Sequence, residues 1–167
     1  MQLTAPVQRA LNEQVGKEFY AAYLYLAMSC WFAERNLDGF AKWMRIQAQE
    51  ERDHAMRILG YLEDRKGHVE LGAIAQPKVA WKTPLGVFEA AARHEAQVSS
   101  SLKALYERAG KDKDYATQVM LQWFLTEQVE EEKTSTAIVE RLRLFGDTPS
   151  GLMMLDRQLG ERGGEKG

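Results

Sequence analysis

The sequence predicts an all-α protein: a four-helix bundle of two antiparallel hairpins joined by a long crossover, followed by a short fifth helix. Three observations support this fold class. Apolar residues repeat at steps of three and four along most of the chain, which is the helical period. Proline is scarce, with four in 167 residues. The hydrophobic content of 45% and charged content of 28% are typical of a soluble globular protein of one domain.

The ends of the predicted helices are marked by prolines and glycines. Pro6, Pro84 and Pro149 are tolerated in a first helical turn, and Gly67, Gly110 and Gly146 follow the last periodic residue of a helix. These signals place the helices at about residues 4–33, 38–66, 84–109, 112–145 and 148–159. We expect one domain over residues 1–160 and a polar, flexible tail over residues 161–167.

The connections between the helices predict the topology. Residues 34–37 and 110–111 are too few for anything except antiparallel hairpins. Residues 67–83, about 17 in number, can span ~55 Å when extended. A helix of about 27 residues is ~40 Å long. The second connection can therefore run the length of the bundle and leave the second and third helices parallel.

Each long helix carries a metal-capable side chain on its apolar stripe, close to its midpoint. Burial of a carboxylate costs several kcal/mol unless a partner neutralises it. In an antiparallel bundle the midpoints meet at one level, so these side chains should converge. Carboxylates with a single imidazole suit iron or manganese, and a bridging carboxylate implies two ions about 3.5–4 Å apart. The side chains are Glu18 on the first helix, Glu51 and His54 on the second, Glu95 on the third, and Gln128 and Glu131 on the fourth.

Each of these signals has a simpler interpretation when taken alone. A single Glu-x-x-His on a helix is usually solvated surface, and one carboxylate on a stripe can reflect a misjudged helix rotation. Four coincidences at the same depth favour the metal site. Tyr25 lies on the face of Glu18, two turns later, but a tyrosine there is commonly a core residue with a bonded hydroxyl. His68 and His94 have no partner pattern, and we expect both at the surface.

Charge and cysteine content argue against several functional classes. A net charge of -2 and a pI near 6.0 do not favour nucleic acid or an anionic membrane as a partner. No apolar run reaches the ~18 residues of a membrane span, and no secretory signal is visible at the N-terminus. Cys30 is the single cysteine, which excludes an internal disulfide and a thiolate zinc cluster. We expect Cys30 to be a buried apolar filler and the protein to be cytoplasmic.

These residues together resemble the ferroxidase centre of bacterial and archaeal non-haem ferritins. The similarity rests on Glu18 with Tyr25, Glu-Arg-Asp-His at 51–54, Glu95 and Gln-Val-Glu-Glu at 128–131, and it covers residues 5–160. It implies a ferritin-like bundle that oxidises Fe(II) to Fe(III) with O₂ or peroxide and stores the product as a mineral. It also implies a homo-oligomeric shell of twenty-four chains.

The resemblance further implies a role for each site residue. Glu18, Glu51 and His54 would bind the first iron, and Glu51, Glu95 and Glu131 the second, with Gln128 close by. Glu50, Glu127 and Glu130 occupy the positions of a third iron site, and Tyr25 and Trp123 are possible electron donors.

Two departures from related patterns define the subtype. Gln128-x-x-Glu131 replaces a second Glu-x-x-His, so the second iron should bind more weakly. Arg52 stands where a bacterioferritin has its haem-binding methionine, so no haem is expected.

Three other functions remain open from the sequence. A di-metal carboxylate oxidase or oxygenase would act on an organic substrate in a pocket beside the metals. A mini-ferritin would coat DNA, but the tail is balanced in charge. A metal-free bundle would be purely structural. The apolar fifth helix, with Met153, Met154 and Leu155, should contact another subunit, unless it folds back onto its own bundle.

Overall fold

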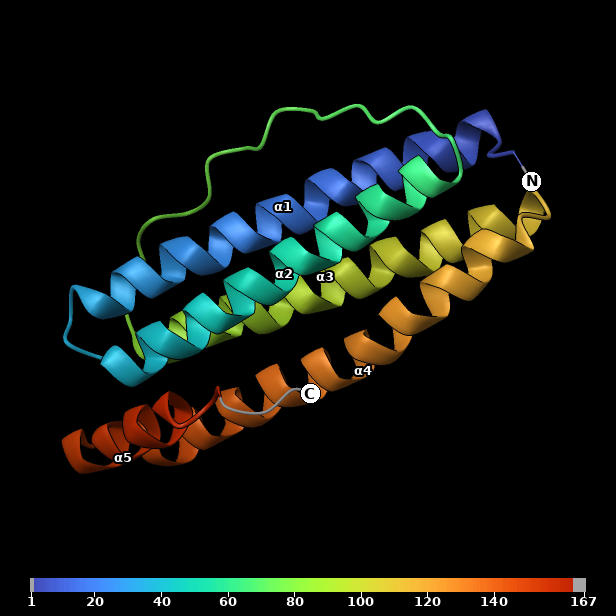
Figure 1. Ribbon diagram of the computed structural model, residues 1–167. Coiled ribbons are helices and arrows are strands. Elements are labelled where there is room, and N and C mark those ends of the chain that lie inside the picture. Colours follow the sequence, from blue (N-terminus) through green and yellow to red (C-terminus); the bar gives the residue numbers. More distant parts are fainter. Residues whose placement is uncertain (1, 164–167) are drawn as a thin grey trace.

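The computed structural model describes residues 2–163, which form five α-helices and no strand (Figure 1). This confirms the predicted all-α class. The helices are α1 (Ala5–Ala33), α2 (Asp38–Asp64), α3 (Pro84–Lys111), α4 (Tyr115–Phe145) and α5 (Pro149–Gly160).

The bundle consists of two antiparallel hairpins, α1 with α2 and α3 with α4. Figure 1 shows the connection from α2 to α3 running back along the length of the bundle beside α1, so that α2 and α3 are parallel. Trp81 is buried near the end of this crossover, with its ring 6.4 Å from that of Trp31 in an edge-on arrangement. The predicted crossover topology is therefore present.

Threonine caps begin three of the five helices. Thr4, Thr83 and Thr148 each accept a hydrogen bond from the backbone N–H three residues later, at 3.4, 3.0 and 3.1 Å. A proline follows each of them within two residues, where its missing N–H has no helical partner to lose. A capping threonine followed by a proline therefore marks the start of each hairpin, at α1 and α3, and the start of α5.

The turn between α3 and α4 differs from the prediction. We expected the fourth helix to begin at about residue 112, but α3 continues to Lys111 and α4 begins at Tyr115. Lys113 breaks the helical path because it adopts a left-handed φ of 57°. Asp114 then caps α4 by accepting the N–H of Thr117 at 3.1 Å.

The core consists of two apolar clusters on either side of a polar layer. One cluster lies toward α5 and includes Phe32, Phe40 and Phe88. The other lies toward the N-terminus and includes Leu11 and Leu121. The metal-capable side chains predicted on the stripes are all buried: Glu18, Glu51, His54, Glu95, Gln128 and Glu131. The carboxylates of the stripes occupy the layer between the clusters, at mid-helix.

Helix α5 folds back onto the first turn of α2. Its Leu155 and Leu159 are buried. A Cβ on Gly39 would lie 1.7 Å from the carbonyl oxygen of Asp156, so only glycine permits this approach. The Asp156 carboxylate accepts the N–H of Phe40 at 2.9 Å and caps α2, whose own N-cap residue has no side-chain bond.

The opposite side of α5 remains free for another contact. Met153 and Met154 are 71% and 53% exposed. The helix therefore packs on its own bundle and still presents an apolar surface.

Cys30 and His94 differ from the expectation in their burial, and His68 agrees with it. Cys30 is exposed and is not a core filler, because it lies on the face of α1 away from the stripe. His94 is partly buried rather than at the surface, with its ring 5.9 Å from that of Tyr20. His68 is exposed as expected. None of the helices within residues 2–163 is long and apolar enough to cross a membrane.

Candidate metal centre

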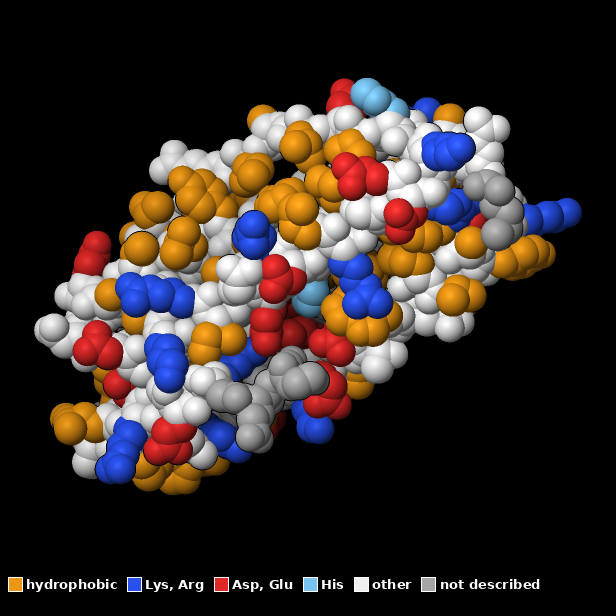
Figure 2. All heavy atoms as spheres, in the orientation of Figure 1, with side chains coloured by type: hydrophobic (Ala, Val, Ile, Leu, Met, Phe, Trp, Pro, Cys, Tyr) orange, Lys and Arg blue, Asp and Glu red, His pale blue; other side chains and the backbone are white. Residues whose placement is uncertain are grey.

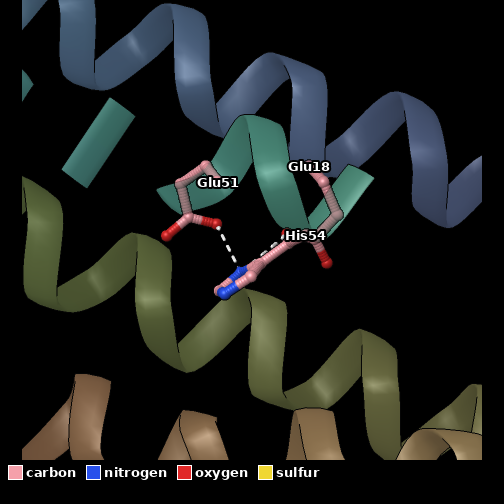
Figure 3. Close-up of side chains that lie close together, drawn as sticks. All are labelled: Glu18, Glu51 and His54. Carbon is pink, nitrogen blue, oxygen red and sulfur yellow. Dashed lines mark ion pairs between the residues drawn. The ribbon is translucent and has the colours of Figure 1, made fainter. Parts of the chain in front are cut away.

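Glu18, Glu51 and His54 meet in the polar layer between α1 and α2. Each offers one ligand atom, and these atoms all lie within 4.8 Å of one another. Nδ1 of His54 lies 3.4 Å from Oε2 of Glu51 and 4.0 Å from Oε2 of Glu18 (Figure 3). All three side chains are buried. The spacing of one turn between Glu51 and His54 places both on the same face of α2, as predicted.

The Glu18 carboxylate shows a deficit of partners. Its Oε1 accepts a hydrogen bond from Gln14 at 2.7 Å, but its buried Oε2 has no hydrogen-bond partner within residues 2–163. Burial, and secondarily the charge of Glu51, raises the pKa of Glu18 to about 8. A bound cation would offset both effects.

The second hairpin contributes two further buried carboxylates. Glu95 of α3 accepts hydrogen bonds from the hydroxyl of Tyr25 and from Nε2 of Gln128, the latter at 2.7 Å. Glu131 of α4 accepts Nε2 of Gln47 at 2.8 Å, and the same nitrogen lies 3.1 Å from Oε1 of Glu51. Hydrogen bonds therefore join the two hairpins across the centre.

Burial also raises the pKa values of the remaining carboxylates. Desolvation is the main cause for Glu51, Glu95 and Glu131, and the neighbouring carboxylates add to it at each residue. Burial, followed by the charge of Glu95, likewise raises the pKa of Tyr25 well above its ordinary value. The layer thus holds several acidic groups that are poorly solvated and repel one another. Such a site favours divalent or trivalent cations.

Two glutamines hold the carboxylates and were not predicted as functional residues. Gln14 precedes Glu18 by four residues, and Gln47 precedes Glu51 by four, so each amide lies one turn from its carboxylate. The repeated Gln-x-x-x-Glu spacing is visible in the sequence and could have predicted that these glutamines contact the carboxylates. The contact of Gln47 with Glu131 depends on the packing of α4 and has no signal within the second helix.

Trp123 lies at the edge of the layer rather than within it. Its ring centroid is 5.5 Å from that of His54, and the Arg57 guanidinium lies 3.9 Å from the same indole ring. The indole therefore packs directly against the imidazole.

The structure does not bring together the residues expected to form a third iron site, which share no cluster of metal-capable atoms within residues 2–163. Glu50 forms an ion pair with Arg162 at 2.6 Å, and Glu130 forms one with Lys133 at 3.4 Å. Glu127 is half-buried. Figure 2 shows acidic side chains gathered at the middle of this face, over α2 and α4. Arg162 falls in the expected tail, of which residues 164–167 lie outside the described residues.

Known proteins share both the sequence pattern and the fold. The family model of the ferritin-like domain matches residues 8–145. The chain belongs to the ferritin family. A bacterial non-heme ferritin of Campylobacter jejuni is 41% identical over 157 residues, which cover 94% of each chain. One of Bacteroides fragilis is also 41% identical, over 160 residues that cover 96% of this chain and 99% of the relative. A third, from Staphylococcus aureus, is 37% identical over 160 residues.

Solved ferritin structures agree with the bundle in detail. The open pore ferritin of the archaeon Archaeoglobus fulgidus superposes with a TM-score of 0.95 at 42% identity, covering 96% of this chain and 98% of that chain. A humanized archaeal ferritin superposes with a TM-score of 0.96 at 41% identity. These likenesses confirm the predicted ferritin fold and the resemblance to non-haem ferritins.

Proposed function

We propose that the chain stores iron, and that it oxidises Fe(II) to Fe(III) at an intrachain di-iron centre. The observation that carries the proposal is the convergence of the buried Glu18, Glu51 and His54 in one ligand set, with one carboxylate oxygen of Glu18 left without a hydrogen bond. Glu95 and Glu131 extend this set toward the second hairpin. Membership of the ferritin family supports iron as the metal.

The hydrogen bonds suggest how two ions would share the ligands. Glu18, Glu51 and His54 would bind the first iron, and Glu51, Glu95 and Glu131 the second. Glu51 is suited to bridge because one oxygen faces His54 and the other faces Gln47, which also contacts Glu131. Gln128 would hold Glu95 in place rather than supply charge. With no second imidazole, the second iron should be released more easily.

Iron is the substrate in this proposal, and O₂ or hydrogen peroxide is the acceptor. Two Fe(II) ions each lose one electron, and the two electrons with two protons reduce O₂ to hydrogen peroxide or hydrogen peroxide to water. The carboxylates favour Fe(III) over Fe(II) because their Coulomb attraction grows with the charge of the ion. That difference is the driving force that the protein contributes, while the dry bundle excludes competing reactions.

The protein residues also have to release protons as the ions bind. A metal binds the deprotonated carboxylate, and burial holds the pKa of Glu18 at about 8 in the ion-free chain. Binding should therefore become tighter as pH rises toward 8. Tyr25, which donates a hydrogen bond to Glu95, would give an electron to partly reduced oxygen.

Storage of a mineral requires a closed assembly, and we propose a homo-oligomeric shell of twenty-four chains in the cytoplasm. Exposed apolar side chains support extensive subunit contacts. They include Tyr23 and Leu26 on α1, Ile74 in the crossover, and Met153 and Met154 on α5. Arg52, next to Glu51, has an exposed side chain that pairs with Asp53 at 3.8 Å, and we propose no haem there.

The test is oxidation of about two Fe(II) per chain in air, followed by the near-ultraviolet absorbance of Fe(III). We expect fast oxidation by the parent protein and strongly slowed oxidation by Glu51→Ala and His54→Ala. Glu63→Ala is the matched control, because Glu63 is exposed on the same helix. Oxidation by the parent no faster than in buffer would refute the ferroxidase activity and leave a passive metal-binding bundle.

A further inference from the structure

Arg162 returns from the end of α5 to the edge of the candidate metal centre. The chain leaves α5 at Gly160, whose carbonyl oxygen accepts a hydrogen bond from Lys42 of α2 at 2.8 Å. Gly163 has a φ of +113°, and a Cβ there would lie 2.8 Å from Ile46, so glycine permits the chain to pass this close to α2. Arg162 is thereby directed onto α2 at the level of the carboxylates.

The guanidinium of Arg162 makes three contacts with α2. Nη2 donates to Oε2 of Glu50 at 2.6 Å, and Nη1 donates to Oε1 of Gln47 at 2.8 Å. The guanidinium carbon lies 4.5 Å from the ring of Trp43. The side chains of Arg162 and Glu50 are 22% and 23% exposed, so the pair is largely shielded from water. A charged pair in such a setting is stronger than a surface pair.

These contacts connect Arg162 to the ligands of the centre. An arginine only donates hydrogen bonds, so the amide oxygen of Gln47 has to face it and the amide nitrogen has to face the carboxylates. That nitrogen lies 2.8 Å from Glu131 and 3.1 Å from Glu51. Arg162 therefore supplies a positive charge at the place where Glu50 meets the acidic layer.

We propose that Arg162 is a tethered cation that occupies the Glu50 carboxylate in the iron-free chain and competes there with a third metal ion. The inference rests on the proposed function, because it takes the centre to be a metal site that Glu50 extends. Entry of an ion at Glu50 would require the guanidinium to leave, which would also free the Gln47 amide. Arg162, from the C-terminal segment of the chain, would thus lower the affinity of the Glu50 site for a metal ion.

The test is a calorimetric titration of the metal-free, assembled protein with Co(II), which reports binding without oxidation. The parent should bind at least two Co(II) per chain in the range expected of a di-metal centre. In Arg162→Ala we expect the Co(II) that binds beyond the two ions of the di-metal centre to bind about fivefold to twentyfold more tightly, because the competing charge has gone. Arg162→Lys keeps the charge but loses the planar fork that reaches Glu50 and Gln47 together, so its affinity should fall between those of the parent and Arg162→Ala.

Two further variants separate competition from a general effect of charge. Arg157→Ala removes the same charge from an exposed position on α5 and should leave all affinities unchanged. In Arg162→Ala/Glu50→Gln the gain should disappear, because the carboxylate that pairs with Arg162 is absent. Circular dichroism would establish that each variant is folded.

Several outcomes would overturn the inference. Unchanged Co(II) affinities in Arg162→Ala, beside a parent that binds two or more ions, would refute competition and leave the proposed function intact. Weaker binding at every site would make Arg162 a support of the centre instead. An equal gain in Arg157→Ala would reduce the effect to net charge. A parent that binds no Co(II) would overturn the proposed function and this inference together.

Discussion

Gln14 donates its amide N–H to one oxygen of Glu18 at 2.7 Å, while the other oxygen of Glu18 faces His54 across 4.0 Å. One half of the carboxylate is thus held by the protein, and the other half points into the centre. The same division recurs at Glu51, where Gln47 contacts one oxygen and His54 lies near the other. The glutamines orient the ligands before any ion arrives.

Gln14→Ala should weaken metal binding without removing a ligand. Loss of the amide donor frees the Glu18 side chain to rotate, and it removes a hydrogen bond that stabilises the charged carboxylate. We expect the affinity for the first Co(II) to fall by about 10-fold to 100-fold at neutral pH. Gln97→Ala, at an exposed position on α3, is the control and should bind as the parent does. Equal affinities in the two variants would show that the Gln14 contact is dispensable.

The stability of the metal-free chain should fall as pH rises from about 4.5 to 8. Glu18 has a folded pKa of about 8 against an ordinary value of 4.5, so the folded chain retains a proton that the unfolded chain loses in this window. Each proton that the folded chain holds and the unfolded chain has lost lowers the free energy of unfolding by on the order of 1.4 kcal/mol per pH unit. Thermal unfolding at fixed chain concentration with a chelator would measure the trend.

Glu18→Gln is the matched variant for that prediction. The amide cannot ionise, so its metal-free form should unfold at a higher temperature than the parent at pH 8 and show a shallower pH dependence. Its affinity for Co(II) should nevertheless fall sharply, because a ligand charge is lost. A variant as pH-dependent as the parent would assign the slope to other groups of the layer.

Tyr25→Phe should change the product of oxygen reduction more than it changes metal binding. The hydroxyl contacts Glu95 but contributes no ligand charge, so Co(II) affinity should stay within about threefold of the parent. If Tyr25 gives an electron to partly reduced oxygen, its loss should increase the hydrogen peroxide released per Fe(II) oxidised. A peroxidase-coupled assay would measure it, with Tyr20→Phe as control. Equal peroxide yields from Tyr25→Phe and the parent would show that Tyr25 only forms a hydrogen bond and gives no electron.

Gly39→Ala should displace α5. The added Cβ would lie 1.7 Å from the carbonyl oxygen of Asp156, so the helix has to shift and its cap on α2 is lost. We expect a loss of about 2–4 kcal/mol in the free energy of unfolding and faster hydrogen exchange over residues 149–160. Gly60→Ala is the control, because a Cβ there meets nothing within 4 Å. It should be neutral or stabilising. Unchanged exchange in Gly39→Ala would contradict the close docking.

The sequence allowed the helices and most of the buried carboxylates to be predicted, because both follow from periodicity within one helix. Glu18 and Glu131 could be placed at the same level since the hairpins are antiparallel. The contacts of Gln47 with Glu131 and of Arg162 with Glu50 could not, because they depend on how separate segments return to each other. The turn at Lys113 was also missed, since a single left-handed residue leaves no periodic signal.

The crossover of residues 65–83 divides the proposed ligands unequally. Glu18, Glu51 and His54 all belong to the hairpin that is complete before the crossover begins, whereas Glu95 and Glu131 follow it. The first ion could therefore be captured by one half of the molecule, while the second would clamp the two halves together. The second ion would then act as a removable cross-link between the two hairpins, in addition to the hydrogen bonds that already join them.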